Sequence, residues 1–139
     1  MKEVALMDSS KQTDNKLRWQ ADVDGVNFKL YIPKWRVPRP WPSRITVCIS
    51  DVEPHVDRET SPFTVTNSPL EPLLEQPIVA IADRVSDHTQ TARFAPRGDP
   101  KEWQIGEPYI PYSLLPDSSV RTVHIEVRWD RSAGTWSDE

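Results

Sequence analysis

The sequence predicts a mostly β protein, built as an antiparallel β-sandwich or a partly closed barrel with proline-rich loops. Three observations predict it: short runs in which apolar and polar residues alternate, an Asp-Gly pair between two such runs, and 14 prolines scattered over 139 residues. Alternation with a period of two is typical of a strand with one buried face, and scattered prolines suppress long helices. The alternative is an α+β fold with a short N-terminal helix.

The chain length is that of one domain, which we expect to span residues 1–139. Residues 1–15 and 131–139 are expected to be peripheral or frayed, because chain ends often are. Residues 51–77 are expected to form a long loop, since this region is rich in prolines and acidic residues.

Residues 16–23 and 26–32 are the clearest pair of strands. Leu17, Trp19, Ala21 and Val23 share one face of the first run, and Val26, Phe28, Leu30 and Ile32 share one face of the second. Asp24-Gly25 joins them, and this dipeptide tolerates the positive φ angles of a tight hairpin turn. The sequence therefore predicts a β-hairpin here.

Further strands are predicted by the same alternation or by short apolar runs. They cover residues 43–50, 78–85 and 120–129, with weaker patterns at 63–66, 89–95 and around 103–105. Helix-like patterns are confined to the first dozen residues and to residues 112–115.

The net charge of −4 is strongly segregated. Residues 25–50 carry five basic side chains and no acid, whereas residues 51–77 carry six acids and one arginine. Adjacent blocks of opposite charge attract each other within a chain or between two copies. Because the basic block is opposed by an acidic one, nucleic-acid binding is disfavoured.

Cellular location is predicted from what the sequence lacks. Cys48 is the single cysteine, so no intrachain disulfide or four-cysteine zinc site can form. The N-terminal residues do not resemble a secretory signal, and no apolar run is long enough for a membrane helix. We therefore expect a cytoplasmic protein without metal or cofactor.

The stretch PKWRVPRPWP, residues 33–42, has two interpretations. Proline has no backbone donor, so the stretch is predicted to be a stiff extended crossover rather than the middle of a sheet. In the first interpretation Trp35 and Trp41 close one end of the core. In the second they form a binding surface together with Arg36, Arg39 and Arg44, because tryptophan and arginine are enriched at interaction hot spots.

Self-association or another protein partner is the function that the second interpretation favours. The basic stretch of one subunit would then meet the acidic 51–77 loop of another. The alternative is a small-molecule or carbohydrate binder, in which Trp103, Tyr109 and Tyr112 line a cleft beside the sheet. The same three rings are also compatible with a hydrophobic lid.

An enzyme is the less favoured class. His124 and Glu126 lie two residues apart on one predicted strand face, and Asp83, Asp87 and His88 cluster at the end of another strand. Each set is more typical of a polar surface or turn. Cys48 points outward on its strand, where a nearby Arg44 could lower its pKa, but a lone cysteine on a strand is more often an inert packing residue. No phosphate-binding, zinc-protease or nucleophile motif occurs in the chain.

Overall fold

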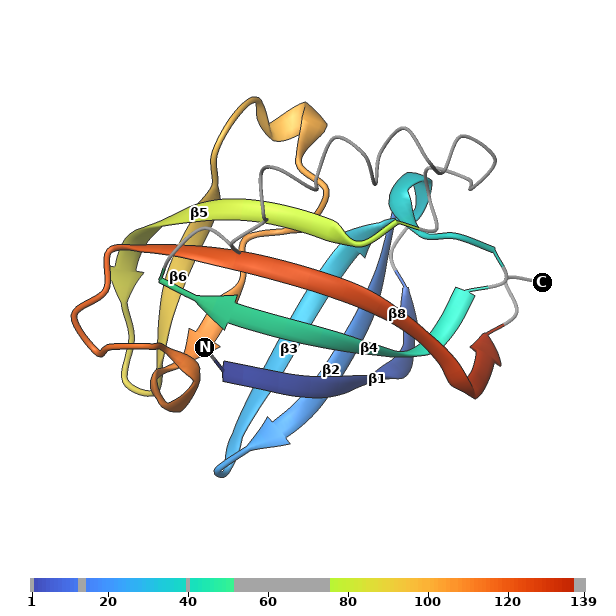
Figure 1. The fold of residues 1–139 in the computed structure, drawn as a ribbon, viewed down its shortest axis with the longest axis horizontal. Coiled ribbons are helices and arrows are strands. Elements are labelled where there is room, and N and C mark those ends of the chain that lie inside the picture. Colours follow the sequence, from blue (N-terminus) through green and yellow to red (C-terminus); the bar gives the residue numbers. More distant parts are fainter. Residues whose placement is uncertain (1, 13–14, 40, 52–75, 137–139) are drawn as a thin grey trace, which may run out of the picture.

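Eight strands form one antiparallel sheet that curls into a nearly closed barrel (Figure 1). The computed structural model describes residues 2–12, 15–39, 41–51 and 76–136. The strands are β1 (Lys2–Gln12), β2 (Lys16–Val23), β3 (Val26–Pro33), β4 (Trp41–Ser50), β5 (Ile78–Asp87), β6 (Thr91–Pro96), β7 (Tyr109–Pro111) and β8 (Thr122–Trp136). Short 3-10 turns are η1 (Lys34–Arg36), η3 (Pro100–Glu102) and η4 (Tyr112–Leu114). The all-β prediction is confirmed.

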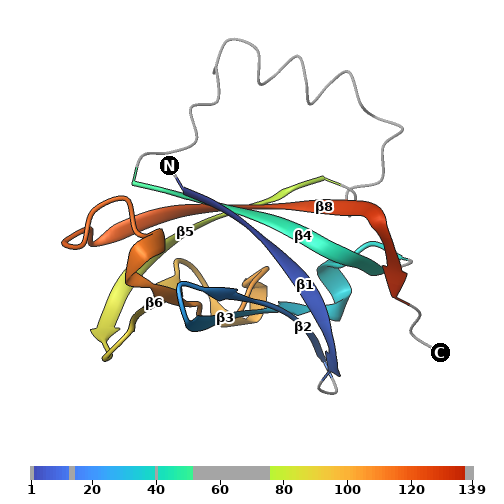
Figure 2. The ribbon, with the colours of Figure 1, turned by 90° about the horizontal axis from the view of Figure 1, so that it is seen from below.

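The strand order is β3-β2-β1-β4-β8-β5-β6-β7, and neighbouring strands are antiparallel. β1 to β3 and β5 to β7 are therefore two meanders, joined in the middle by β4 and β8. Figure 2 shows β4 and β8 on one side of the interior and β3 and β6 on the other. Within the described ranges, no helix is long and apolar enough to cross a membrane.

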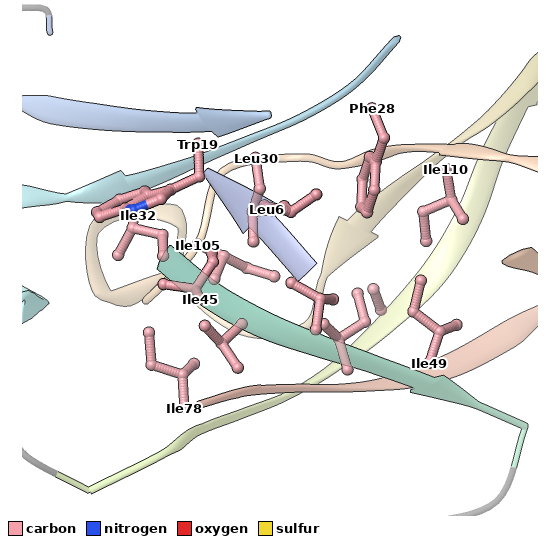
Figure 3. Packing of buried hydrophobic residues seen from close by; sticks show 14 of the residues in the cluster. Leu6, Trp19, Phe28, Leu30, Ile32, Ile45, Ile49, Ile78, Ile105 and Ile110 are labelled. Carbon is pink, nitrogen blue, oxygen red and sulfur yellow. The ribbon is translucent and has the colours of Figure 1, made fainter. Parts of the chain in front are cut away.

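Side chains from every strand fill the interior, as expected for a small barrel (Figure 3). They follow the period-two pattern, and the predicted inward residues of the hairpin are buried or packed against the core, except Val26, which is only partly buried. The largest fully buried side chains are Trp19, Trp41, Phe28, Phe94, Leu6, Leu17, Leu30, Ile32, Ile45, Ile49, Ile78 and Ile105.

The predicted hairpin at Asp24-Gly25 is confirmed. Both residues have positive φ, 52° and 85°, as a two-residue type I′ turn requires. Val23 pairs with Val26 directly beside the turn, and the backbone N–H of Gly25 donates to Asp22 Oδ1 at 2.8 Å. The register between β2 and β3 runs without a shift from this turn to Pro33.

Residues 2–12 form β1, so the N-terminal helix of the α+β alternative is wrong. β1 pairs with both β2 and β4, and these ladders supply the hydrogen bonds that a helix would have formed internally. Residues 131–136 continue β8. The expected strand at 63–66 and most of the expected 51–77 loop lie outside the described residues.

The expected strand around residues 103–105 is also wrong. Trp103 follows η3, and the strand of this region is β7, which begins at Tyr109. The 112–115 segment forms the short turn η4. Pro100 begins η3, and its missing N–H makes it poorly suited to a ladder but well suited to the first position of a helical turn.

The stretch 33–42 differs in two ways from the extended crossover that was predicted. Lys34–Arg36 form the 3-10 turn η1, and β4 already begins at Trp41. Pro42 is tolerated in β4 for two reasons. The register between β4 and β8 shifts between Pro42 and Arg44, and the described pairs between β1 and β4 end at Arg44, before they reach Pro42. The carbonyl of Pro42 accepts a hydrogen bond from Trp19 Nε1 at 3.0 Å.

The two ends of the sheet, β3 and β7, meet at a seam. The backbone N–H of Gly106 donates to the carbonyl of Tyr31 at 2.8 Å across this seam. β7 is only three residues long, whereas β3 has eight. The barrel is therefore closed beside Tyr31 and less complete toward the Asp24-Gly25 turn.

Candidate functional site

An open groove of about 1130 Å³ runs along the seam; we call it the seam groove. One wall comes from β2 and β3, and the other from the β5–β6 turn and the segment before β7. The lining residues are Asn15, Lys16, Val26, Asn27, Lys29, Tyr31, His88, Thr89, Gln90, Thr91, Trp103, Gly106, Glu107 and Tyr109. The groove exists because the two ends of the sheet do not pair along their full length.

Aromatic rings line the groove on both walls. Tyr109 is 43% exposed, and its ring lies 5.3 Å from the His88 ring, centroid to centroid, with the planes tilted by 49°. Tyr31 belongs to the opposite wall, and its hydroxyl accepts a hydrogen bond from Arg18 Nη1 at 3.4 Å. Trp103 is half-buried. The rings of Tyr31, Trp103 and Tyr109 therefore give the groove flat apolar faces that are bordered by polar groups.

The turn before Trp103 explains how this ring is held. Gly98 has a φ of 99°, which favours glycine, and Asp99 Oδ1 accepts from the backbone N–H of Lys101 at 3.0 Å. The backbone N–H of Trp103 then donates to the carbonyl of Pro100, and its indole Nε1 donates to the carbonyl of Gly98 at 3.2 Å. This turn thus fixes the indole beside the groove.

The charged lining is mainly basic. Lys16 and Lys29 come from one wall, and among the described residues Lys29 takes part in no ion pair. The acid on the other wall, Glu107, lies 3.9 Å from Arg93 Nε. The hydrogen bond with Tyr109 and the nearby Glu107 carboxylate raise the pKa of Arg93. This arrangement favours a ligand with negative charge.

Two of the three rings predicted to form an aromatic cleft, Trp103 and Tyr109, do line the seam groove. Tyr112 does not. Its hydroxyl donates to the carbonyl of His88 at 2.6 Å, and the Arg84 guanidinium lies 5.9 Å from its ring. Tyr112 therefore supports the wall from outside by holding the backbone of His88.

The residues predicted to form a basic binding surface separate in the structure. Trp35 is 55% exposed, whereas Trp41 is only 2% exposed and belongs to the core. Arg39 and Lys34 lie over the Trp41 ring at 5.3 and 5.8 Å. Arg44 pairs with Asp130 at 2.7 Å.

Arg36 is 6% exposed and lies among acceptors rather than at the surface. Its Nε donates to Gln104 Oε1 at 2.6 Å, and Nη2 donates to the carbonyls of Gln76 and Pro77 at 2.9 and 3.2 Å. Its guanidinium also lies 5.9 Å from the Trp129 ring. Burial lowers the pKa of Arg36 from its ordinary value. Arg36 thus ties η1 to the start of β5.

The predicted cluster of Asp83, Asp87 and His88 does not converge. Asp83 accepts from Arg97 Nε and Nη2 at 2.8 and 2.9 Å, and Thr122 Oγ1 donates to it at 2.8 Å. These hydrogen bonds hold the pKa of Asp83 below its usual value. Asp87 pairs with Arg84 at 2.7 Å, and His88 faces the seam groove.

His124 and Glu126 lie on one face of β8, as predicted, but form no joint site. His124 lies between Ser50 and Ile81 on the neighbouring strands, and Glu126 pairs with Arg128 at 3.2 Å. Among the described residues, no group of three or more potential ligands is placed to hold a metal ion.

Cys48 is only 8% exposed, and its Sγ donates to Glu3 Oε2 at 3.3 Å. Burial and this carboxylate raise the pKa of the thiol. Arg44, which the sequence offered as a residue that could lower this pKa, is instead paired with Asp130. The thiol is therefore protonated at neutral pH and a poor nucleophile.

Several groove residues escaped the sequence reasoning. Asn27, Lys29 and Tyr31 alternate with buried residues and therefore resemble the solvated face of an ordinary hairpin. Lys16 and Glu107 belong to no motif. Their proximity depends on the approach of β3 to the segment before β7, which are far apart in the chain.

The chain was compared with known protein families, with curated proteins and with solved structures, and no match was found in any of the three comparisons.

Proposed function

We propose that this protein is a binding module that holds a ligand with a flat ring or sugar face in the seam groove. The observation that carries this proposal is the groove of about 1130 Å³ with Tyr31, Trp103 and Tyr109 in its walls. Aromatic faces stack on flat apolar surfaces, and convergent polar groups orient what is bound. The seam groove combines both features.

The size of the groove favours a ligand longer than one ring. Pockets for drug-sized molecules have volumes of about 300 to 1,000 Å³, and the seam groove lies slightly above this range. It is also open, so a chain-like molecule can enter from the side. Lys16 and Lys29 favour acidic groups on the ligand.

Indole N–H signals in nitrogen–proton correlation spectra test this proposal. Mixtures of simple aromatic acids, short oligosaccharides and short acidic peptides are titrated into the labelled protein. We expect the signal of Trp103 to shift and the signal of Trp35 to remain in place, because only Trp103 lines the groove. Tyr109→Ala should abolish the shift, and the control Val85→Ala, at an exposed apolar residue outside the groove lining, should preserve it. Shifts confined to Trp35 would overturn the proposal.

Self-association through the basic stretch 33–44 is the second candidate. The observation that favours it is the large exposed fraction of Trp35. The patch is small, however, because Trp41 and Arg36 are buried, and residues 52–75 of its acidic counterpart lie outside the described residues. Sedimentation at low and high salt tests it: a salt-weakened dimer that Trp35→Ala disrupts supports this candidate, and a monomer at every concentration contradicts it.

A further inference from the structure

We propose that the ligand of the seam groove is an oligosaccharide, bound with its sugar rings against the aromatic side chains of the two walls. This inference rests on the proposed function and names the class of ligand. Three properties of the groove favour that class: its length along β3, the kind of polar groups in its lining, and the balance of its charges.

The groove is long enough for several linked rings. Its lining follows β3 from Val26 to Tyr31, a distance of roughly 17 Å at the rise of a β-strand. A single ring in contact with one aromatic side chain lies within about 4.5 to 7 Å of it, so it leaves most of this length unused. A ligand with several rings in a row makes contacts along the full groove.

The aromatic side chains offer mainly their ring faces. Trp103 donates its indole N–H to the carbonyl of Gly98 at 3.2 Å, and the hydroxyl of Tyr31 accepts from Arg18 at 3.4 Å. Tyr109 remains 43% exposed. One face of a sugar ring is made of C–H groups, and removing this face and an aromatic face from water is favourable.

The polar lining suits hydroxyl groups. Asn27 comes from β3, and Thr89, Gln90 and Thr91 come from the β5–β6 turn on the opposite wall. Within the described ranges, none of these four side chains forms a hydrogen bond inside the protein. An amide places a donor beside an acceptor, and a hydroxyl is both. The neighbouring hydroxyls of a sugar have the same dual character, whereas an aromatic acid carries its polar group at one end.

The balance of charges separates a sugar chain from a nucleic-acid strand, which also presents rings in a row. A nucleic acid carries a negative charge on every nucleotide and binds best along a track of cations. The lining holds Lys16 and Lys29 but also Glu107, and Lys16 already interacts with another group of the protein. A sugar chain without a charge on every ring needs no such track.

Chain length tests this class. Linear pentasaccharides of glucose, mannose and N-acetylglucosamine, their monosaccharides and a pentathymidylate are titrated into the labelled protein, and the indole signal of Trp103 is followed. We expect at least one pentasaccharide to shift this signal and to bind tenfold or more tightly than its monosaccharide, because several rings share the groove. Equal affinities of each pentasaccharide and its monosaccharide would overturn the proposal, since a site for one ring would then suffice.

Salt dependence distinguishes a sugar from a strand that carries phosphates. The affinity for an uncharged pentasaccharide should change less than about twofold between about 50 and about 500 mM salt, because its binding releases no counterions. A pentathymidylate that binds more tightly than every sugar and loses affinity steeply over this range would assign the groove to a nucleic acid and overturn the proposal.

Variants of the polar lining test the contacts with hydroxyl groups. Asn27→Ala and Gln90→Ala should each weaken binding of the pentasaccharide about fivefold, because each removes a hydrogen-bonding side chain. Ser118→Ala removes a polar group at an exposed site outside the groove lining and should leave the affinity unchanged. Full affinity in both lining variants would overturn the proposal.

The outcomes also separate this inference from the proposed function. If no sugar binds while an aromatic acid or a peptide shifts the indole signal of Trp103, the oligosaccharide proposal falls and the groove remains a binding site. If no probe shifts that signal, both fall.

Discussion

Two segments of this protein combine tryptophan, proline and basic residues but have different roles. The stretch 33–42 places Trp41 in the core, whereas the segment 97–109 places Trp103 and Tyr109 along the seam groove. The difference lies in the neighbouring strands. Trp41 begins β4, which is paired in the middle of the sheet, while Trp103 precedes β7 at the end of the sheet. Composition alone therefore does not separate a core aromatic from a binding aromatic.

Arginines show the same contrast. Arg36 lies in the first segment and is buried among three acceptors, although its sequence context suggested an exposed recognition residue. Arg97 lies in the second segment and forms an exposed ion pair with Asp83. The buried arginine connects distant parts of the sheet, whereas the exposed one steadies the turn that carries Trp103.

Truncating one aromatic from each segment should give the largest difference in stability. Trp41→Ala is expected to lower the free energy of unfolding by about 3 to 5 kcal/mol, because it removes a fully buried indole. Tyr109→Ala should cost about 1 kcal/mol or less, because this ring is largely exposed. Urea denaturation followed by circular dichroism measures both. Equal losses would contradict the contrast between the two segments.

Removing the guanidinium of Arg36 should have the next largest effect. Arg36→Met keeps the apolar stem but leaves the partly buried carbonyls of Gln76 and Pro77 without their donor, and we expect a loss of about 2 kcal/mol. Lys29→Met, at the seam, should change stability by about 0.5 kcal/mol or less. The same denaturation experiment compares the free energies of unfolding of the two variants. A value for Arg36→Met close to that of the wild type would contradict the structural role assigned to Arg36.

The ion pair beneath the Trp103 turn should give a small, pH-dependent effect. The pKa of Asp83 is lower in the folded protein, so its contribution is present above the unfolded value of about 3.9 and is lost as the pH falls through the folded value. Because the pair is exposed, Asp83→Asn should cost only about 0.5 kcal/mol at pH 7.

Denaturation of the wild type and Asp83→Asn at a series of pH values measures that difference. It should shrink as the pH falls below about 4. A difference that stays constant down to the acid limit would show that the carboxylate charge is not its source. The indole signal of Trp103 provides a local control, since the turn should loosen while the signal of Trp19 stays in place.

Much of the sheet could be predicted because its information is local. The alternation in residues 16–23 and 26–32 and the Asp-Gly turn between them each restrict the chain to one hairpin and one register. The same reasoning located β4 to within two residues of its observed start. β1 was missed because its sequence alternates poorly, and its pairing with β2 and β4 overrides that weak local preference.

The site could be predicted only in part. Trp103 and Tyr109 were recognised as candidates for a cleft from their residue types, but Lys16, Lys29 and Tyr31 had no signal that set them apart from an exposed strand face. Their proximity depends on how β3 meets the segment before β7, which is a property of the assembled sheet.

The sequence by itself determined most of the inward side chains of the β2–β3 hairpin, because alternation on a strand leaves one buried face whatever the neighbours are. Tertiary structure alone decided which aromatic residues stay at the surface and where the sheet fails to close. Those outcomes depend on which strands meet at the seam, and that choice is made by contacts between residues far apart in the chain.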